Sequence, residues 1–147
     1  MWENIWFACI GMVTVYIFYT DCRYYWIPDR AIALLVLLHG AAWYGGMIQP
    51  QWSTVLGVSV TFCLLWCWKP QGIGTGDIKL AMILSCSCMG REGVLMLWSA
   101  FFSALVCALV VWRCKGEKMI PFAPFLLCGW WFAKWEAAAI LIQPGNL

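Results

Sequence analysis

The stretch GVLMLWSAFFSALVCALVVW, residues 93–112, carries no charged side chain. A helix needs about 20 predominantly apolar residues to cross the hydrocarbon core of a bilayer, so this stretch predicts a membrane-spanning helix. The rest of the chain has the same character, because 64% of its 147 residues are hydrophobic and 11% are charged. A soluble domain has about 25% charged residues, and we therefore expect an integral membrane protein rather than an unusually apolar soluble one. The net charge of +2 is small, and we expect no nucleic-acid partner.

Five other apolar segments accompany this one, and residues typical of turns separate them. The six expected spans cover residues 2–20, 31–48, 52–68, 78–89, 93–112 and 119–132, of which the fourth is short. The predicted fold is therefore all-α, a polytopic membrane bundle of about six transmembrane helices, in a single membrane-embedded domain over residues 1–147. After the sixth span, Lys134, Trp135 and Glu136 are expected at the outer interface, with residues 137–142 along the membrane surface.

Basic residues near the ends of the spans set the expected orientation. If the loops after the first, third and fifth spans share one side, that side holds seven basic residues, against Arg91 and Lys134 on the other. The side with more basic residues is expected to face the cytoplasm, which places both termini outside. The seven residues are Arg23, Arg30, Lys69, Lys79, Arg113, Lys115 and Lys118.

The nine cysteines and the single histidine, His39, show no metal-binding pattern. No two cysteines have the C-x-x-C spacing, and a zinc site needs about four converging ligands. We expect the cysteines to be small buried hydrophobic residues, and His39 to pack between helices. No metal and no cofactor is therefore predicted.

Two of the seven acidic residues lie where the chain is expected to enter the membrane. Asp21 follows the first span and Asp77 precedes the fourth, so both are expected at the cytoplasmic margin, at similar depth, on different helices. Carboxylates at membrane depth are costly and usually functional. The alternative is a pair of interfacial loop charges that never meet. Apart from Asp29 beside Pro28, the other acids are expected to be solvated: Glu3, Glu92, Glu117 and Glu136.

Glycines precede Asp77 in the sequence GIGTGD, residues 72–77. Gly74 and Gly76 have no β-carbon, so another chain can approach their backbone closely. Such a loop suits an extended peptide, and it also suits a phosphate. A phosphate-binding P-loop, however, needs a lysine after its last glycine, whereas this chain has Asp77, whose charge repels phosphate. A peptide substrate is therefore favoured.

Two aspartates held close together can share a single proton, because their like charges disfavour simultaneous ionisation. The ionised carboxylate acts as a general base on a water molecule, and the protonated one polarises the scissile carbonyl. This chemistry, that of aspartic proteases, requires neither a metal nor a histidine. Asp21 and Asp77 are the residues that the sequence offers for it.

Three stretches of the chain, in this order and at this spacing, resemble the type IV prepilin peptidases, which are membrane aspartic proteases with a G-x-G-D motif. Asp21 precedes Ile27-Pro28-Asp29, residues 74–79 fit G-x-G-D-[VI]-K, and residues 120–125 are similar to the P-F-x-P-F opening of the family's last helix. By this resemblance the catalytic aspartates are Asp21 and Asp77. The resemblance also implies a set of residues that shape the site or bind the substrate: Gly74, Gly76, Pro28, Asp29, Lys79, Pro121 and Pro124.

The resemblance implies removal of the leader from prepilin-like or pseudopilin proteins, after a glycine, at the cytoplasmic face of the bacterial inner membrane. The implied partners are these substrates, the lipid bilayer and components of a pilus or secretion assembly. The basic leader would meet Asp29 and Glu117. Bifunctional members carry an insertion between the first helices, with paired C-x-x-C motifs, and also N-methylate the cleaved pilin. This chain has no such insertion or motif, so we expect a peptidase-only form without methyltransferase activity or S-adenosylmethionine binding.

Expectations for the neighbouring residues follow from local chemistry. Pro28 is expected to start the second helix, because proline is accepted in a first helical turn. Lys79 is expected to extend to the interface rather than to pair with Asp77. Pro121 and Pro124 are expected to open the last helix beside the site. The alternative function is a non-catalytic membrane subunit or proton relay of a secretion assembly, which would not need the glycines before Asp77.

Overall fold

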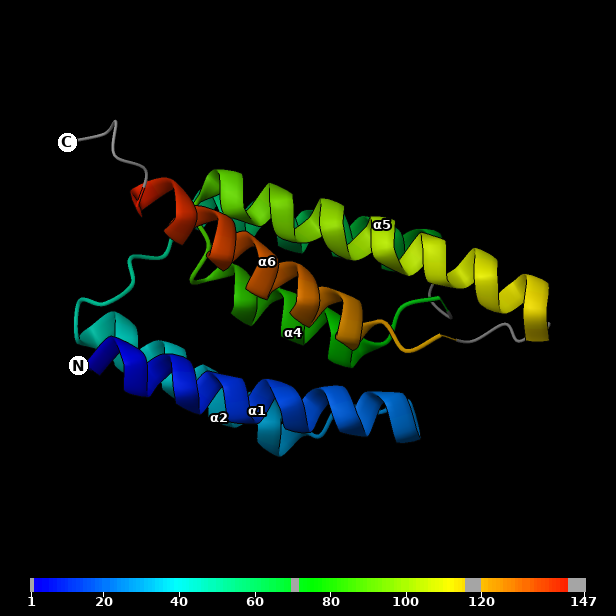
Figure 1. The fold of residues 1–147 in the computed structure, drawn as a ribbon, viewed down its shortest axis with the longest axis horizontal. Helices are drawn as coiled ribbons and strands as arrows, with labels where there is room; N and C mark the ends of the chain where they lie inside the picture. The colour runs from blue at the N-terminus through cyan, green and yellow to red at the C-terminus, as the bar shows by residue number, and fades with distance from the viewer. Residues whose placement is uncertain (1, 70–71, 116–119, 143–147) are drawn as a thin grey trace.

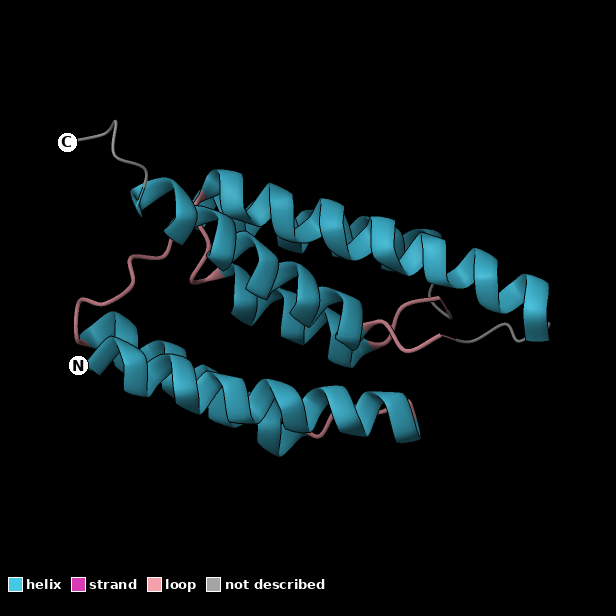
Figure 2. Ribbon diagram, viewed as in Figure 1, coloured by secondary structure: helices cyan, strands magenta, loops and turns pink. Residues whose placement is uncertain are grey.

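The computed structural model describes residues 2–69, 72–115 and 120–142, and within these ranges the chain forms helices and no strand (Figure 2). The all-α prediction is therefore confirmed for the described residues. Glu117, Lys118 and residue 119, the expected start of the sixth span, lie outside them. The helices are α1 (Trp2–Tyr24), α2 (Asp29–Tyr44), α3 (Trp52–Trp68), α4 (Thr75–Ser85), α5 (Gly90–Lys115) and α6 (Ala123–Ile142).

The helices run roughly along one direction and pack as neighbouring pairs (Figure 1). α1 lies against α2, α5 lies against α6, and α4 contacts α2, α3 and α6. The C-terminal ends of α1 and α5 and the N-terminal ends of α4 and α6 lie at the same end of the bundle, on the right in Figure 1. The end of α1 and the start of α4, which carry the two aspartates of interest, are therefore neighbours in space.

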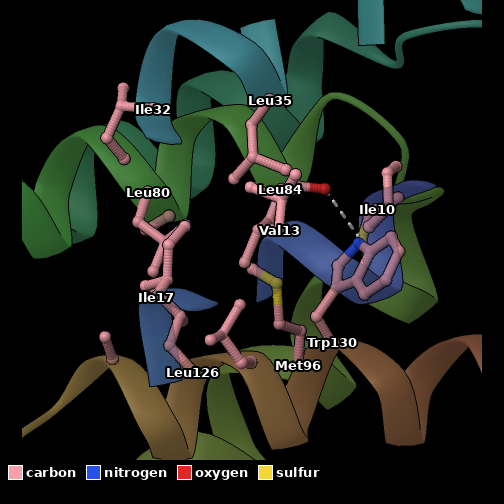
Figure 3. Packing of buried hydrophobic residues seen from close by; sticks show 14 of the residues in the cluster. Ile10, Val13, Ile17, Ile32, Leu35, Leu80, Leu84, Met96, Leu126 and Trp130 are labelled. Carbon is pink, nitrogen blue, oxygen red and sulfur yellow. Dashed lines mark hydrogen bonds between the residues drawn. The ribbon is translucent and has the colours of Figure 1, made fainter. Parts of the chain in front are cut away.

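Apolar side chains from α1, α2, α4, α5 and α6 meet in a common core between the helix pairs (Figure 3). Ile17 of α1, Leu80 of α4 and Leu126 of α6 are fully buried there. This core fixes the relative positions of the three helices that build the candidate site. The labelled members are Ile10, Val13, Ile17, Ile32, Leu35, Leu80, Leu84, Met96, Leu126 and Trp130.

Several helix boundaries differ from the expected spans, and two of the differences concern the aspartates. α1 continues to Tyr24, so Asp21 lies inside its last turns instead of after its end. α4 begins at Thr75 and ends at Ser85, so Asp77 lies in its first turn. Both carboxylates are therefore held by helical backbone and not by loops.

The expected break after the sixth span is wrong, because α6 is one continuous helix that ends at Ile142. Residues 133–142 contain neither proline nor glycine and include four alanines, so nothing in them interrupts a helix. The expected separate segment along the surface, residues 137–142, is thus the last part of α6.

Lys134 and Glu92 form an ion pair at the end of the bundle opposite the two aspartates, with Nζ 2.7 Å from Oε2. Glu92 also accepts the backbone N–H of Met89 at 3.0 Å, and the Lys134 ammonium donates to the carbonyl of Ser87. The Glu92 side chain is only 15% exposed. The expectation of a solvated Glu92 is therefore wrong, since this pair ties α6 to the first turn of α5.

His39 is buried, as expected for a helix-packing residue. One ring nitrogen, Nδ1, lies 2.9 Å from the carbonyl oxygen of Leu35, and the ring packs edge to face against Trp6 at 5.6 Å between centroids.

The expectation that the cysteines are buried holds only for Cys88, the one buried cysteine among the described residues. The expectation of buried cysteines is wrong for the five exposed ones. They are Cys22, Cys63, Cys67, Cys114 and Cys128.

Two of the described helices, Trp2–Tyr24 and Gly90–Cys114, are long and apolar enough to cross a membrane, judged by length and composition. Trp52–Trp68 is apolar but shorter.

Candidate active site

Asp21 and Asp77 line the same cavity, of about 210 Å³, at the end of the bundle where α1 stops and α4 starts. The reading in which the two charges never meet is thus wrong. Among the expected site residues, the cavity brings together the two aspartates with Gly74, Gly76, Asp29 and Lys79. It also includes residues that sequence reasoning did not single out: Tyr25, Trp26, Ile27 and Thr75.

The start of α6 holds the Asp21 carboxylate. The backbone N–H of Ala123 donates to Oδ2 of Asp21 at 3.0 Å, and the Asp21 side chain is buried. Ala123 is the first residue of α6, and the first N–H groups of a helix have no partner within the helix. One of these free donors is therefore satisfied by an aspartate from α1, and the positive end of the α6 dipole faces that carboxylate.

Asp77 lies in the first turn of α4, before the apolar part of that helix, and is half-buried. Its Oδ1 atom is buried and has no hydrogen-bond partner in the part of the chain that the structure describes. Burial, and after it the charge of Asp21, raises the pKa of Asp77 to about 7, although a backbone hydrogen bond from Gly74 opposes the shift. Near neutral pH this carboxyl is therefore protonated for about half of the time.

The glycines before Asp77 allow close approach, but the neighbour at Gly76 is the protein itself. A β-carbon added to Gly76 would lie 3.2 Å from Cβ of Ile27 and 3.3 Å from its Cδ1. A β-carbon on Gly74 would lie 3.3 Å from Oδ2 of Asp77. The interpretation that both glycines clear space for a substrate therefore needs correction: Gly76 lets α4 approach the loop after α1, and Gly74 leaves room for the Asp77 carboxylate.

Gly76→Ala is expected to lower proteolytic activity by about tenfold or more, because small displacements of reacting groups have large effects on rate. Ile27 and the start of α4 would have to separate by a few tenths of an ångström, which shifts Asp77 relative to Asp21. The measurement is the initial rate of substrate cleavage by purified protein. Gly40→Ala is the matched control, since nothing lies within 4 Å of the added β-carbon, and it should keep the rate. Equal rates for the two variants would contradict the spatial role of Gly76.

The turn between α1 and α2 contains a residue in an uncommon conformation. Tyr25 has a φ of 53°, in the left-handed region, where a residue with a side chain costs about 1–2 kcal/mol. The turn places Ile27 against Gly76 and Pro28 before α2, which starts at Asp29. Pro28 thus stands at the helix start, as expected. Pro28 marked the break in the sequence, but no glycine marks position 25, so the left-handed conformation of Tyr25 had no signal.

Lys79 pairs with Asp29, its Nζ lying 2.9 Å from Oδ1 across the mouth of the cavity. The expectation that Lys79 simply extends to the interface is wrong, whereas its separation from Asp77 agrees with that expectation. The two side chains are 53% and 78% exposed, so the pair contributes at most about 1 kcal/mol to stability. Its importance for the site is that Asp77 is left without a cationic partner that would keep it ionised.

Pro121 and Pro124 flank Ala123 and do not line the cavity. The carbonyl of Phe122 accepts the N–H groups of Phe125 and Leu126 at 3.1 and 3.2 Å, which starts the helix at Ala123. The two prolines thus bracket the donor that reaches Asp21. Ala123 is the functional candidate that sequence reasoning missed, and the residues around it were the available signal.

A protein-family model described as the type IV leader peptidase family matches residues 7–112. The chain belongs to the type IV leader peptidase family. The match includes Asp21, Asp77 and the glycines between them, and it ends before α6. A search of curated proteins and a search of solved structures find no match.

Membership in this family makes the chain a leader-peptidase-like protease of a membrane-associated family, with prepilin-like proteins as its general class of substrate. The two long apolar helices agree with this setting. The described residues contain no group of three or more His, Cys, Asp or Glu side chains that could hold a metal ion.

Proposed function

We propose that the chain is a membrane aspartic endopeptidase that removes the leader of prepilin-like or pseudopilin proteins. The observation that carries this proposal is the shared cavity of Asp21 and Asp77 in a member of the leader peptidase family. We place the protein in the bacterial inner membrane as one domain of six spans, with the site toward the cytoplasm. The excess of basic residues in the connections at the same end supports this orientation.

The proposed reaction uses one ionised and one protonated aspartate. The ionised carboxylate takes a proton from water while the water oxygen attacks the scissile carbonyl carbon, and the protonated aspartate gives its proton to the carbonyl oxygen. The resulting diol collapses when the first aspartate passes its new proton to the amide nitrogen and the second recovers a proton from the diol. The C–N bond breaks, a carboxylic acid and an amine leave, and both aspartates return to their starting states.

We also propose a peptidase without methyltransferase activity. The connection between α1 and α2 contains only residues 25–28, which leaves no place there for an inserted cytoplasmic domain. The basic leader of a prepilin would approach from this side, where Asp29 lines the mouth of the cavity. Because Lys79 already neutralises one oxygen of Asp29, the attraction of this single acid for the leader would be modest.

The function is tested by the pH dependence of leader removal. Above about pH 7 the rate is expected to fall, because Asp77 loses the proton that the carbonyl oxygen must receive. In acid the rate is expected to fall again, since both carboxyls become protonated and no base remains. Purified protein in liposomes, incubated with a prepilin-like substrate from pH 4 to 9, provides the measurement. A rate that still rises between pH 7.5 and 9 would contradict a shared-proton pair.

The orientation has a separate test with single-cysteine proteins. Cys22 is exposed beside Asp21, and Met89 is exposed at the opposite end of the bundle. A membrane-impermeant maleimide added to intact spheroplasts should label Met89→Cys and spare Cys22. The opposite labelling would place the site on the outer side of the membrane.

The activity assay also tests the alternative function. A chain that never cuts a prepilin-like substrate at any pH would favour the non-catalytic subunit or proton relay.

A further inference from the structure

We infer that the two aspartates have fixed and different roles: Asp21 carries the negative charge, held by the backbone N–H of Ala123, and Asp77 carries the proton. The inference rests on the proposed aspartic mechanism and adds to it the role of each carboxyl and a positioning group on α6.

The contacts of Asp21 favour its ionised form. Its Oδ2 accepts the Ala123 N–H at 3.0 Å, and both groups are buried. A backbone N–H can only donate, so it stabilises a carboxylate more than a carboxylic acid. The donor belongs to the first residue of α6, where the helix dipole adds positive potential. The bond joins positions that are 102 residues apart, so it forms only when α6 packs beside α1.

The contacts of Asp77 favour its protonated form. Its Oδ1 is buried without a hydrogen-bond partner among the described residues, and an ionised oxygen in that position would keep its full desolvation cost. A protonated carboxyl avoids most of that cost, so Asp77 is the member of the pair that keeps the proton. The charge of Asp21 acts in the same direction, since it disfavours a second charge nearby.

The other ionisable groups around the pair do not offset this asymmetry. Asp29 of α2 and Lys79 of α4 bind each other at 2.9 Å. Tyr25, after the end of α1, lines the cavity, and Cys22 follows Asp21 on the same helix. Neither has a hydrogen bond to the two aspartates through its side chain in the described part of the chain. Each aspartate accepts a backbone hydrogen bond, Asp21 from Ala123 and Asp77 from Gly74. The two differ because Oδ1 of Asp77 is buried without a partner among the described residues, whereas no buried oxygen of Asp21 lacks one.

In the reaction, Asp21 is then the base that takes a proton from water, and Asp77 is the acid that protonates the carbonyl oxygen. Ala123 is a positioning residue, because it acts through Asp21 and not on the substrate. The position of α6 thereby controls which carboxyl is charged, although the family match itself ends before this helix.

The charge assignment can be measured without any substrate. The chain has only three aspartates, Asp21, Asp29 and Asp77, so labelling with side-chain ¹³C-carboxyl aspartate gives three NMR signals. The variants Asp21→Asn, Asp29→Asn and Asp77→Asn assign them. The chemical shift of each signal is followed against pH. Two interacting carboxyls can each show two titration steps, so the larger step of each signal is compared. We expect the Asp21 signal to change mainly at lower pH than the Asp77 signal. The reverse order, or two signals that change at the same pH, would overturn the inference.

The role of the Ala123 N–H is tested by removing only that donor. Ala123→Pro deletes the N–H at a first helical position, where proline suits the backbone. Ala123→Gly keeps the N–H and is the matched control. The proline variant is expected to move the main Asp21 step upward by about one pH unit or more, the equivalent of a hydrogen bond to a charged group. The glycine variant should leave the step in place.

Folding of the proline variant is checked by circular dichroism and gel filtration. If it does not fold, lactic acid incorporated at position 123 replaces the amide by an ester and deletes the same donor with little change in shape. An Asp21 step that does not move in a folded variant lacking the N–H would overturn the assignment to Ala123.

The titration also separates this inference from the proposed function. If wild-type protein cuts no substrate but the signals titrate in the expected order, the asymmetry stands and the peptidase proposal fails. If it cuts substrate and the order is reversed, the peptidase stands and the roles are exchanged. In an active protein, the acid limb of the rate profile should move upward in Ala123→Pro together with the Asp21 step.

Discussion

Leader removal is expected to stop when either Asp21 or Asp77 is replaced by asparagine, with a loss of about a thousandfold or more. Asparagine keeps the size of the side chain, but it can neither take the proton of the attacking water, as the ionised aspartate must, nor give a proton to the carbonyl oxygen, as the protonated one must. Each aspartate is needed twice in the proposed reaction, so neither variant retains a complete cycle. The measurement is cleavage of a co-expressed prepilin-like protein, with the amount of membrane-inserted variant determined in the same cells.

Glu3→Gln is the matched control, because it makes the same chemical change at an exposed site on the first turn of α1, far from the cavity. It should cut at the wild-type rate. Substantial cleavage by either aspartate variant would exclude the paired mechanism, because that mechanism needs both carboxyls.

Although Asp77→Asn is expected to lose activity, it is expected to gain stability at alkaline pH. The folded-state pKa of Asp77, about 7, lies above its ordinary value of 3.8, so the folded protein binds this proton more tightly than the unfolded chain. Its contribution to stability is therefore complete below about pH 4 and is lost as pH rises through 7. Asparagine has no such dependence, and the variant should unfold at a higher temperature than wild type at pH 8. A variant that is inactive but more stable would show that Asp77 serves catalysis and not the stability of the fold.

The second large effect is expected at Gly129, where α6 crosses α5. A β-carbon there would lie 2.5 Å from the Met96 carbonyl oxygen, 2.8 Å from Ser99 Oγ and 3.2 Å from the Ala100 nitrogen. Two of these are backbone atoms, so relief requires the helices to separate. Overpacking of this kind typically costs about 1–3 kcal/mol, and separation of the helices would also expose the core around Trp130. Gly129→Ala should therefore lose much of its folded yield and melt at a lower temperature in detergent.

Gly57→Ala is the control for this prediction, since Gly57 lies inside α3 and nothing is within 4 Å of its added β-carbon. It should be as stable as wild type or slightly more stable, because alanine favours a helix over glycine by up to about 1 kcal/mol. A Gly129→Ala protein with the wild-type melting profile would show that α5 and α6 are not in such close contact. Where some protein folds, its activity should also fall, because α6 carries Ala123 toward Asp21.

The existence of the helices was largely predictable from local sequence, since runs of apolar residues and the turns between them are local features. The residues at which the helices end were less predictable, because they depend on contacts with other helices. α6 passes the expected stop at residue 132 because Lys134 is not solvated and finds Glu92 on α5. A charge in an apolar stretch was interpreted as a boundary, and only its partner from another helix makes it part of a packed helix.

The two aspartates were predictable as a pair because the expected spans placed both at the same end, and their neighbours were predictable only in part. The sequence identified Gly76 as a point of close approach, but Ile27 of the same chain occupies the space. It identified Lys79 near the site, but the structure pairs it with Asp29. In both cases the residue type indicated a contact at the site, but the sequence did not indicate which residue makes that contact.

By itself, the sequence determined the helical and apolar character of this protein, the family motif, and the two carboxyls that the fold brings to one end. These depend on composition and on short-range spacing. Only the tertiary structure decided that the two carboxyls differ. The N–H of Ala123 reaches Asp21 across 102 residues, while Oδ1 of Asp77 is buried without a partner among the described residues. No local pattern encodes that difference, because it arises from how α6 and α4 pack against α1 and from how much water each carboxyl loses.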